Sequence, residues 1–202
     1  MTLRIPGEVL VMGAGTIGCY LGGSLAAAGV PVTLVGRPRT LDAVATRGLT
    51  VTDLDGRKTH VAAGQVRLAP QVPAGARPAL VLLCVKRGAT AGAAAQLAAP
   101  PPAAARVLSM QNGISNAAVA AQAGAGLVVL PGMVPYNVAE LGPGAYHRGT
   151  AGRLVAQRHD VLDGWPPVFE AAGVPLDLVD DARPIQWGKL LLNLNNPVNA
   201  LS

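Results

Sequence analysis

The sequence holds four polar side chains that could polarise and protonate a carbonyl group. Lys86 and Asn112 each follow a short apolar run, and Lys189 and Asn193 stand four residues apart in the segment WGKLLLNLNN. That spacing places Lys189 and Asn193 on one face of a helix, beside apolar neighbours that could desolvate the lysine. An ammonium group within hydrogen-bond reach of a carbonyl oxygen stabilises negative charge that develops there, and it can then donate its proton.

Each of these residues also has an ordinary structural explanation. A lone lysine at the end of a strand is more often solvated than catalytic, and a helix face that carries Lys and Asn is usually exposed. The Asn112-Gly113 pair is most often a simple turn. The chemistry is therefore predicted only if other elements bring these side chains together with a reactant.

A glycine-rich turn near the N-terminus could supply that reactant by binding a dinucleotide. It has the G-x-G-x-x-G pattern, follows a predicted strand at residues 8–12 and opens a predicted helix at residues 16–28. The three glycines permit a tight turn, close approach of a pyrophosphate and packing of the helix on the strand, while free N–H groups at the helix start face the phosphates. The residues predicted to bind the cofactor here are Gly13, Ala14, Gly15, Thr16, Ile17 and Gly18.

The end of the next predicted strand indicates which dinucleotide is bound. A site that prefers NAD places an Asp or Glu there for the ribose 2′-hydroxyl. The segment LVGRPRT has Arg37 and Arg39 instead, with no acidic residue until Asp42. A guanidinium suits a 2′-phosphate through charge-assisted hydrogen bonds, although a solvated basic loop would have the same sequence. The sequence predicts NADPH or NADP as the cofactor, with Arg37 at its 2′-phosphate.

The composition excludes several other classes of protein. The chain of 202 residues has a formal net charge of +5, but its positive residues are scattered and only 3% of residues are aromatic, so nucleic acid is not an expected partner. No unbroken apolar stretch reaches the roughly 18 residues of a membrane span, and residues 1–7 do not resemble a signal peptide. Cys19 and Cys84 both fall in predicted core elements, which does not suggest a disulfide framework. No His, Cys, Asp or Glu cluster has metal-ligand spacing. We expect a cytoplasmic protein with no membrane partner and no metal.

The order of predicted elements favours an α/β fold with a Rossmann-type, doubly wound parallel sheet. Strands are predicted at residues 8–12, 32–35, 79–85, 106–110, 127–131 and 174–179, and helices at residues 16–28, 41–47, 89–98, 115–122 and 160–172. A hairpin around Asp55-Gly56 pairs residues 49–53 with 58–62. A long helix begins at Asp181. We divide the chain into a Rossmann-type NADP-binding domain, residues 1–180, and the start of a helical domain, residues 181–202.

Taken in order, these motifs resemble the ketopantoate reductase (2-dehydropantoate 2-reductase) family. The segments that carry the resemblance are Gly13–Gly18, Val35-Gly36-Arg37, Val85-Lys86, Gln111-Asn112-Gly113, Tyr146-His147 and Trp187-Gly188-Lys189-Leu190 with Asn193. The resemblance implies a Rossmann domain that binds NADPH, followed by an all-helical substrate domain. It also implies an oxidoreductase of pantothenate biosynthesis that transfers a hydride to the C2 carbonyl of 2-dehydropantoate, giving (R)-pantoate.

By the same resemblance, Lys189 is the general acid, Lys86 lies where cofactor and substrate meet, and Asn112 contacts both. Asn193 is implied to bind the substrate. Asn196 stands one residue early for the family's second substrate asparagine and fills that role only if the helix is locally wound differently. Two other functions stay open: reduction of another bulky 2-oxoacid on the same fold, and NADPH binding without turnover.

The chain is also shorter than the family pattern, whose helical domain continues for roughly 100 residues. It is either a fragment of a longer protein or a natural truncation, and we expect the fragment. The helix from Asp181 then has an uncovered apolar face through Ile185, Trp187, Leu190, Leu191 and Leu194. A homodimer that covers this face is a further expectation.

Overall fold

The computed structural model describes the backbone of residues 3–98 and 105–200, and side chains in these ranges up to residue 192. Six α-helices are found in these ranges: α1 Thr16–Ala27, α2 Pro38–Arg47, α3 Thr90–Ala98, α4 Asn116–Ala123, α5 Trp165–Ala171 and α6 Arg183–Ala200. The strands there are β1 Val9–Met12, β2 Val32–Val35, β3 Leu49–Thr52, β4 Lys58–Val61, β5 Arg67–Ala69, β6 Leu80–Leu83, β7 Arg106–Ser109, β8 Val128–Met133, β9 Val138–Gly142, β10 Ala145–Arg148, β11 Leu154–Gln157 and β12 Leu176–Val179. Short 3-10 turns are η1 Arg87–Ala89 and η2 Asp160–Leu162.

The main sheet confirms the doubly wound α/β fold. Within the described ranges it has eight strands, in the order β12-β11-β8-β7-β6-β1-β2-β5. The neighbouring strands are parallel, with the exception of β8 and β11, which pair antiparallel at Val155 and Met133. The central strand β1 lies between β2 and β6, so the strand order reverses there. A reversal of this kind leaves a crevice outside the carboxyl ends of the strands.

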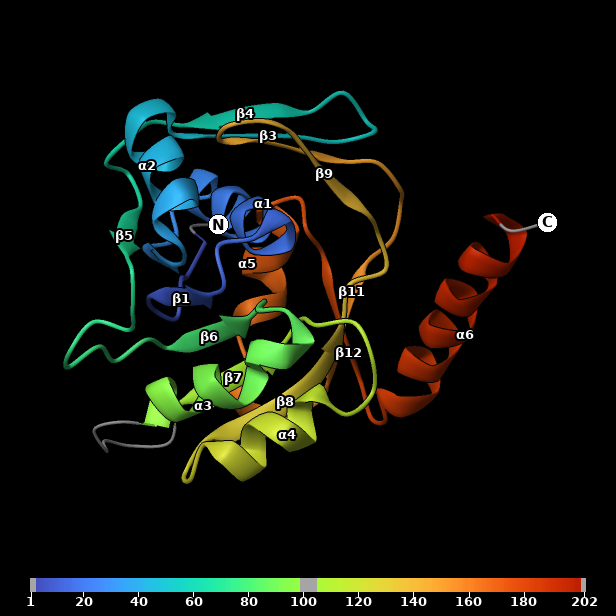
Figure 1. Cartoon of the computed structure of the whole chain (residues 1–202). Helices are drawn as coiled ribbons and strands as arrows, with labels where there is room; N and C mark the ends of the chain where they lie inside the picture. Colours follow the sequence, from blue (N-terminus) through green and yellow to red (C-terminus); the bar gives the residue numbers. More distant parts are fainter. Residues whose placement is uncertain (1–2, 99–104, 201–202) are drawn as a thin grey trace.

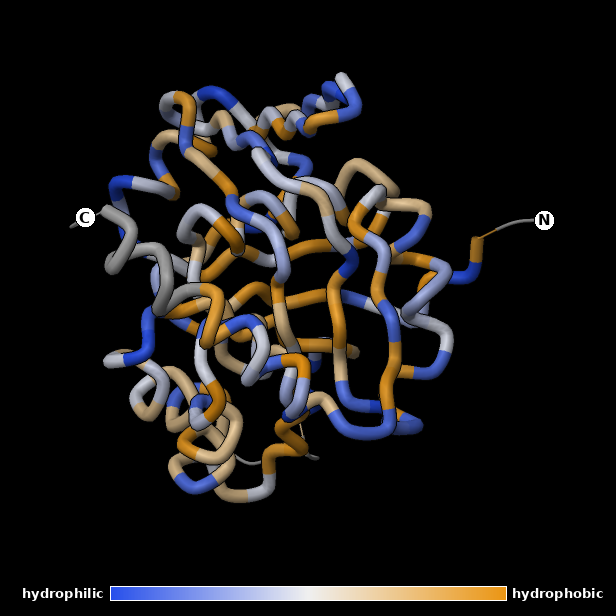
Figure 2. Tube along the Cα trace, turned by 90° about the vertical axis from the view of Figure 1, so that its right-hand side faces the viewer, coloured by the Kyte–Doolittle hydropathy of each residue, from blue (hydrophilic) through white to orange (hydrophobic). Residues whose placement is uncertain are grey.

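Helices cover both faces of the main sheet, and the residues of β1 show why. Val9 and Val11 pack in a core cluster that includes residues of α1 and α5, whereas Leu10 and Met12 pack in a second cluster with alanines of α3 and α4. All four side chains are buried. Side chains of a strand alternate between the two faces, so a strand covered on both sides is apolar throughout. Figure 2 shows this hydrophobic interior along the strands that cross the middle of the molecule.

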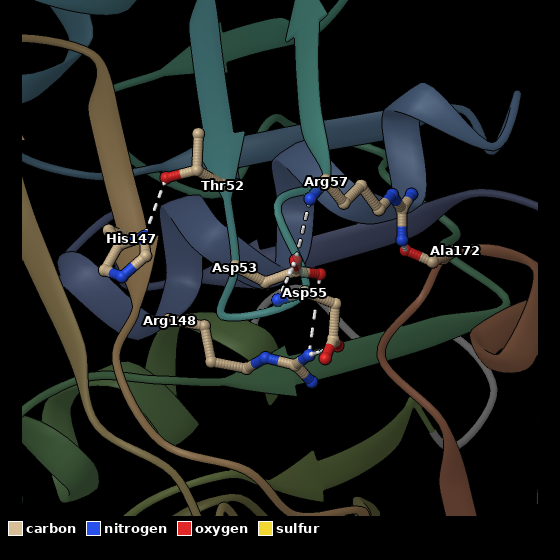
Figure 3. A network of polar contacts seen from close by, with 7 residues as sticks. All are labelled: Thr52, Asp53, Asp55, Arg57, His147, Arg148 and Ala172. Carbon is tan, nitrogen blue, oxygen red and sulfur yellow. Dashed lines mark hydrogen bonds and ion pairs between the residues drawn. The ribbon is translucent and has the colours of Figure 1, made fainter.

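A second sheet lies over α1, on the side away from the main sheet (Figure 1). Its strand order is β4-β3-β10-β9, with Tyr146 of β10 in parallel register with Val51 of β3. The predicted hairpin forms its β3–β4 half. At one end, the guanidinium of Arg148 lies 3.5 Å from the buried carboxylate of Asp53 and 3.3 Å from the exposed carboxylate of Asp55 (Figure 3). The ion pair between Asp53 and Arg148 joins the β3–β4 hairpin to strand β10.

Several details of the expected secondary structure are wrong. The helix expected at residues 160–172 is divided into η2 and α5, because Gly164 adopts a left-handed φ of 82° and Pro166 and Pro167 lack the N–H groups that would continue η2. Helix α2 begins at Pro38 instead of residue 41, since proline suits the first helical position. Strand β5 was missed because three residues carry too little periodicity to be recognised.

Helix α6 follows β12 and extends away from the sheet in Figure 1. Its first turns are fixed where the amide of Gln186 donates a 2.9 Å hydrogen bond to the carbonyl oxygen of Gly132 in β8. The expected apolar face is partly uncovered, since two of its members, Trp187 and Leu191, are each at least half exposed. In the part of the chain that the structure describes, no helix has both the length and the apolarity to cross a membrane.

Candidate active site

The glycine turn joins β1 to α1 at the reversal point of the main sheet. The N–H groups of Gly13 and Ala14 donate to the carbonyl oxygen of Val35 at 2.9 and 2.8 Å, which fixes the turn against the end of β2. Gly13 has a φ of 113°, and a Cβ there would lie 2.7 Å from the backbone nitrogen of Val85. A Cβ on Gly18 would lie 2.1 Å from the carbonyl oxygen of Gly13. These two glycines are therefore required by the fold itself.

Gly15 differs from the other two glycines of the motif. It is exposed, and a Cβ added to it would meet no atom within 4 Å. Neither its φ of −94° nor its ψ of −168° requires glycine. The fold does not explain why position 15 lacks a side chain, whereas close approach of a ligand to the backbone would explain it.

The first turn of α1 can receive an anion. Gly15 is the residue that precedes the helix; no side chain caps the N–H groups of the first turn, and no acidic residue lies in it. Unpaired N–H groups at a helix start combine with the helix dipole to favour a phosphate. The turn thus presents backbone donors without a competing carboxylate.

A cleft with a cavity volume of about 480 Å³ opens from this turn. It runs past Gly36 and Arg37, which follow β2, and past Val85 and Lys86, which follow β6. The Arg37 and Lys86 side chains are exposed. Among the described residues that line it, the charged side chains are these two cations, and neither Asp nor Glu is present. The charge of the cleft suits an anionic ligand.

A second pocket, of about 300 Å³, also borders the start of α1. Ile17 of the glycine motif is part of its wall, and Asn112 and Lys189 line it as well. The remaining lining residues are Met110, Val134, Tyr136, Asn137 and Val138. Because Gly15 lines the cleft and Ile17 lines this pocket, the two spaces adjoin around the first turn of α1.

Lys189 is held in place by the backbone of a distant turn. Its ammonium donates a 2.8 Å hydrogen bond to the carbonyl oxygen of Pro135, between β8 and β9. One turn earlier on α6, Gln186 is bonded to Gly132. Both contacts fall on the same strand-and-turn segment, so they fix the rotation of α6 and direct the ammonium to the pocket wall. Asn193 and Asn196 belong to α6, but their side chains lie outside the described part of the chain.

Sequence reasoning missed the wall formed by Tyr136 and Asn137. Tyr136 is 2% exposed and packs edge-on against Tyr20, with ring centroids 6.0 Å apart, while the guanidinium of Arg148 lies 5.4 Å from its ring. Among the described residues its hydroxyl finds no hydrogen-bond partner, and burial raises its pKa far above the usual range. The segment VPYNV carries no recognisable motif, so nothing in the sequence marked these residues for the pocket.

Cys84 was expected in the core of a strand, but it lies one residue beyond β6, is only partly buried and lines the cleft. Burial of its sulfur raises the thiol pKa to about 12, and burial raises that of Cys19 to about 11. Neither thiol is a ready nucleophile near neutral pH. Across the described residues, no group of three or more His, Cys, Asp or Glu side chains is placed to hold a metal ion.

Comparison with known proteins gives consistent matches. A family model described as ketopantoate reductase PanE/ApbA matches residues 9–160. Two curated relatives named 2-dehydropantoate 2-reductase are 34% identical (Halobacterium salinarum) and 30% identical (Pyrococcus horikoshii); each alignment covers 96% of this chain, and 65% and 64% of the relatives. The chain thus spans about two thirds of their length. A solved PanE/ApbA family ketopantoate reductase from Ralstonia eutropha superposes with a TM-score of 0.82 at 34% identity, over 92% of this chain and 61% of that one.

Proposed function

The chain belongs to the ketopantoate reductase family, and from this premise we propose that it serves an NADPH-dependent reduction of a 2-oxoacid, 2-dehydropantoate, to (R)-pantoate. The observation that carries the proposal is the pocket that Lys189 and Asn112 share beside the glycine turn. A proton donor and an amide from segments 77 residues apart line one small space next to a phosphate-binding helix start.

Three features of the cleft support NADPH as the pyridine nucleotide. The bare backbone at Gly15 leaves room for a pyrophosphate, and the uncapped start of α1 offers it N–H donors. Arg37 stands at the end of β2, where a 2′-phosphate would lie. The lack of an acidic residue among the described lining residues weighs against a preference for the 2′-hydroxyl of NAD.

When bound, NADPH would supply the hydride for the C2 carbonyl of the substrate. The Lys189 ammonium would bind the carbonyl oxygen, stabilise the negative charge that grows on it and donate a proton to it. The Pro135 carbonyl holds the ammonium in a fixed orientation meanwhile. The Asn112 side chain, which also lines the pocket, would donate a hydrogen bond to the substrate, and Lys86, which lines the cleft, would contact the cofactor.

The walls of the pocket combine apolar and polar side chains. Ile17, Met110, Val134 and Val138 would contact the branched body of a 2-oxoacid, and the polar Asn112, Asn137 and Lys189 would contact its oxygen atoms. The proposal also assigns Asn193 and Asn196 to substrate binding, places the boundary of a second domain near residue 180 and allows a homodimer through the exposed face of α6.

The test follows the absorbance of NADPH with 2-dehydropantoate, and separately measures NADPH and NADH binding by fluorescence. Consumption of NADPH with formation of pantoate is the expected result. If the protein binds NADPH tightly but reduces only a different bulky 2-oxoacid, that 2-oxoacid is the substrate in place of 2-dehydropantoate. Tight NADPH binding with no turnover of any 2-oxoacid would show that the protein binds the nucleotide without catalysis. Failure to bind NADPH would contradict the proposal as a whole.

A further inference from the structure

Gln111 is a buried amide that links two loops at the carboxyl edge of the main sheet. It is 7% exposed and follows β7 by two residues. Its Nε2 atom donates hydrogen bonds of 2.8 Å to the carbonyl oxygen of Val85 and 2.8 Å to the hydroxyl of Thr90. Its Oε1 atom accepts a 3.2 Å hydrogen bond from the hydroxyl of Ser109. Both ends of the amide are therefore engaged.

The contacts of Gln111 hold the segment that carries Lys86 at both of its ends. Val85 precedes the lysine, and Thr90 follows it across η1. The Thr90 hydroxyl, which accepts from Gln111, donates in turn to the carbonyl oxygen of Arg87 at 2.8 Å. One side chain from the loop after β7 thus holds the backbone of the loop after β6 in place.

In the loop after β7, Gln111 directly precedes Asn112. The carbonyl oxygen of Asn112 accepts a 2.7 Å hydrogen bond from the side chain of Asn116, which holds the other side of that turn. Lys86 lines the cleft, and Asn112 lines the second pocket. Gln111 therefore stands between the two spaces and is bonded to the backbone of the loop that borders the cleft.

We propose that Gln111 is a positioning residue that fixes the spacing between Lys86 in the cleft and Asn112 in the pocket, and so aligns the two ends of one bound ligand. This inference rests on the proposed NADPH site. A buried polar residue with a purely structural role would contribute to stability alone. A positioning residue must in addition change ligand affinity through the groups that it places.

Gln111→Met keeps the length of the side chain and removes the amide, which leaves the Val85 carbonyl without its donor. We expect the dissociation constant for NADPH to rise about tenfold, an effect of the size found when one buried hydrogen-bonding partner is removed. Thr33→Val is the matched control: Thr33 is 1% exposed and donates a 2.5 Å hydrogen bond to Glu8 near the opposite end of the strands. The Thr33→Val variant should be less stable than the wild type, and its affinity for NADPH should be unchanged.

A double-mutant cycle separates positioning from general destabilisation. If Gln111 acts through Lys86, the Lys86→Met and Gln111→Met changes together should weaken NADPH binding by less than the product of the two single effects. Thr90 gives a second readout: Thr90→Ser keeps the hydroxyl and should bind as the wild type does, whereas Thr90→Val should weaken binding in the same direction as Gln111→Met.

Each outcome decides between the two proposals. Wild-type protein that binds NADPH, with an unchanged affinity in folded Gln111→Met, would overturn the positioning role and leave the proposed function intact. Multiplicative effects in the cycle would also overturn it. If Gln111→Met does not fold, equal affinities of Thr90→Val and Thr90→Ser overturn it instead. Wild-type protein that binds no NADPH contradicts the proposed function, and the inference fails with it.

Discussion

The ammonium of Lys189 lies 2.8 Å from the carbonyl oxygen of Pro135, 54 residues earlier in the chain. This contact connects α6 to the turn between β8 and β9 and places the ammonium in the wall of a pocket that also contains Asn112. A main-chain carbonyl cannot rotate as a side-chain acceptor can, so the hydrogen bond fixes the direction of the Lys189 ammonium. Because this hydrogen bond places the ammonium in the pocket wall, Lys189 is a candidate proton donor although it belongs to a largely exposed helix.

Lys189→Met should abolish most of the reductase activity that the proposal assigns. Loss of a positioned general acid typically lowers turnover about a hundredfold to ten-thousandfold. NADPH affinity should change little, because Lys189 does not line the cleft. Steady-state rates and fluorescence titration check both parts. The control is Arg183→Ala, which removes an exposed cation of the same helix that pairs with Asp181; near-normal turnover in Lys189→Met would contradict the assignment.

Gly15→Ala and Gly18→Ala should fail in different ways. An added methyl at position 15 meets no atom of the described residues within 4 Å, so thermal unfolding should be nearly unchanged while NADPH binding is lost. At position 18 the methyl would collide with the carbonyl of Gly13, so the protein itself should be destabilised. Calorimetry and binding titration on both variants test this. Full NADPH affinity in Gly15→Ala would show that no ligand approaches this backbone.

Arg37→Ala should change the choice of nucleotide. Removal of a charge-assisted partner costs about 1.5–3 kcal/mol, which corresponds to roughly a tenfold to hundredfold weaker binding of NADPH. NADH lacks the 2′-phosphate, so its affinity should stay the same. The matched control is Arg47→Ala at the other end of α2. Equal losses for NADPH and NADH in Arg37→Ala would argue against contact with the 2′-phosphate.

Arg148→Met should cost far more stability than Arg153→Met, although both side chains line the same surface cavity. Arg148 and its partner Asp53 are 8% and 6% exposed, and loss of one member of a buried pair typically costs about 3–5 kcal/mol. Arg153 pairs with Glu170 and Asp177 at the surface, where solvent screens the charges and such pairs contribute little to stability. Free energies of unfolding in urea give the comparison; equal costs would show that the Asp53–Arg148 pair does not secure the second sheet.

Stability should decrease at alkaline pH because of the buried thiols. Burial raises the pKa of Cys84 from 9.0 to about 12, so above pH 9.0 the unfolded chain loses this proton before the folded one does. The contribution of the protonated Cys84 thiol to stability is complete below the thiol pKa of the unfolded chain. It is lost as pH rises from 9.0 towards about 12. Urea unfolding at several pH values measures the slope, which should be shallower in Cys84→Ala than in the wild type. Identical slopes would show that Cys84 is ionised as freely in the folded chain as in the unfolded one.

The sequence alone determined the local parts of this protein. The glycine turn, the alternation of strands and helices, and the hairpin all depend on residues close together in the chain, and the structure has each of them. Helix 160–172 was misjudged where two adjacent prolines and the left-handed Gly164 interrupt the chain, since an apolar pattern does not reveal the backbone angle that a glycine adopts.

Tertiary structure alone decided how the site is assembled. Gln111 acts on a carbonyl 26 residues away, Asp53 pairs with Arg148 across 95 residues, and Lys189 finds its partner in the backbone of Pro135. Side-chain periodicity predicts which face of an element is buried, because it follows from the geometry of a single helix or strand. It cannot predict a main-chain acceptor, because every residue has a carbonyl group, and only the packing of distant segments determines which of them a given side chain meets.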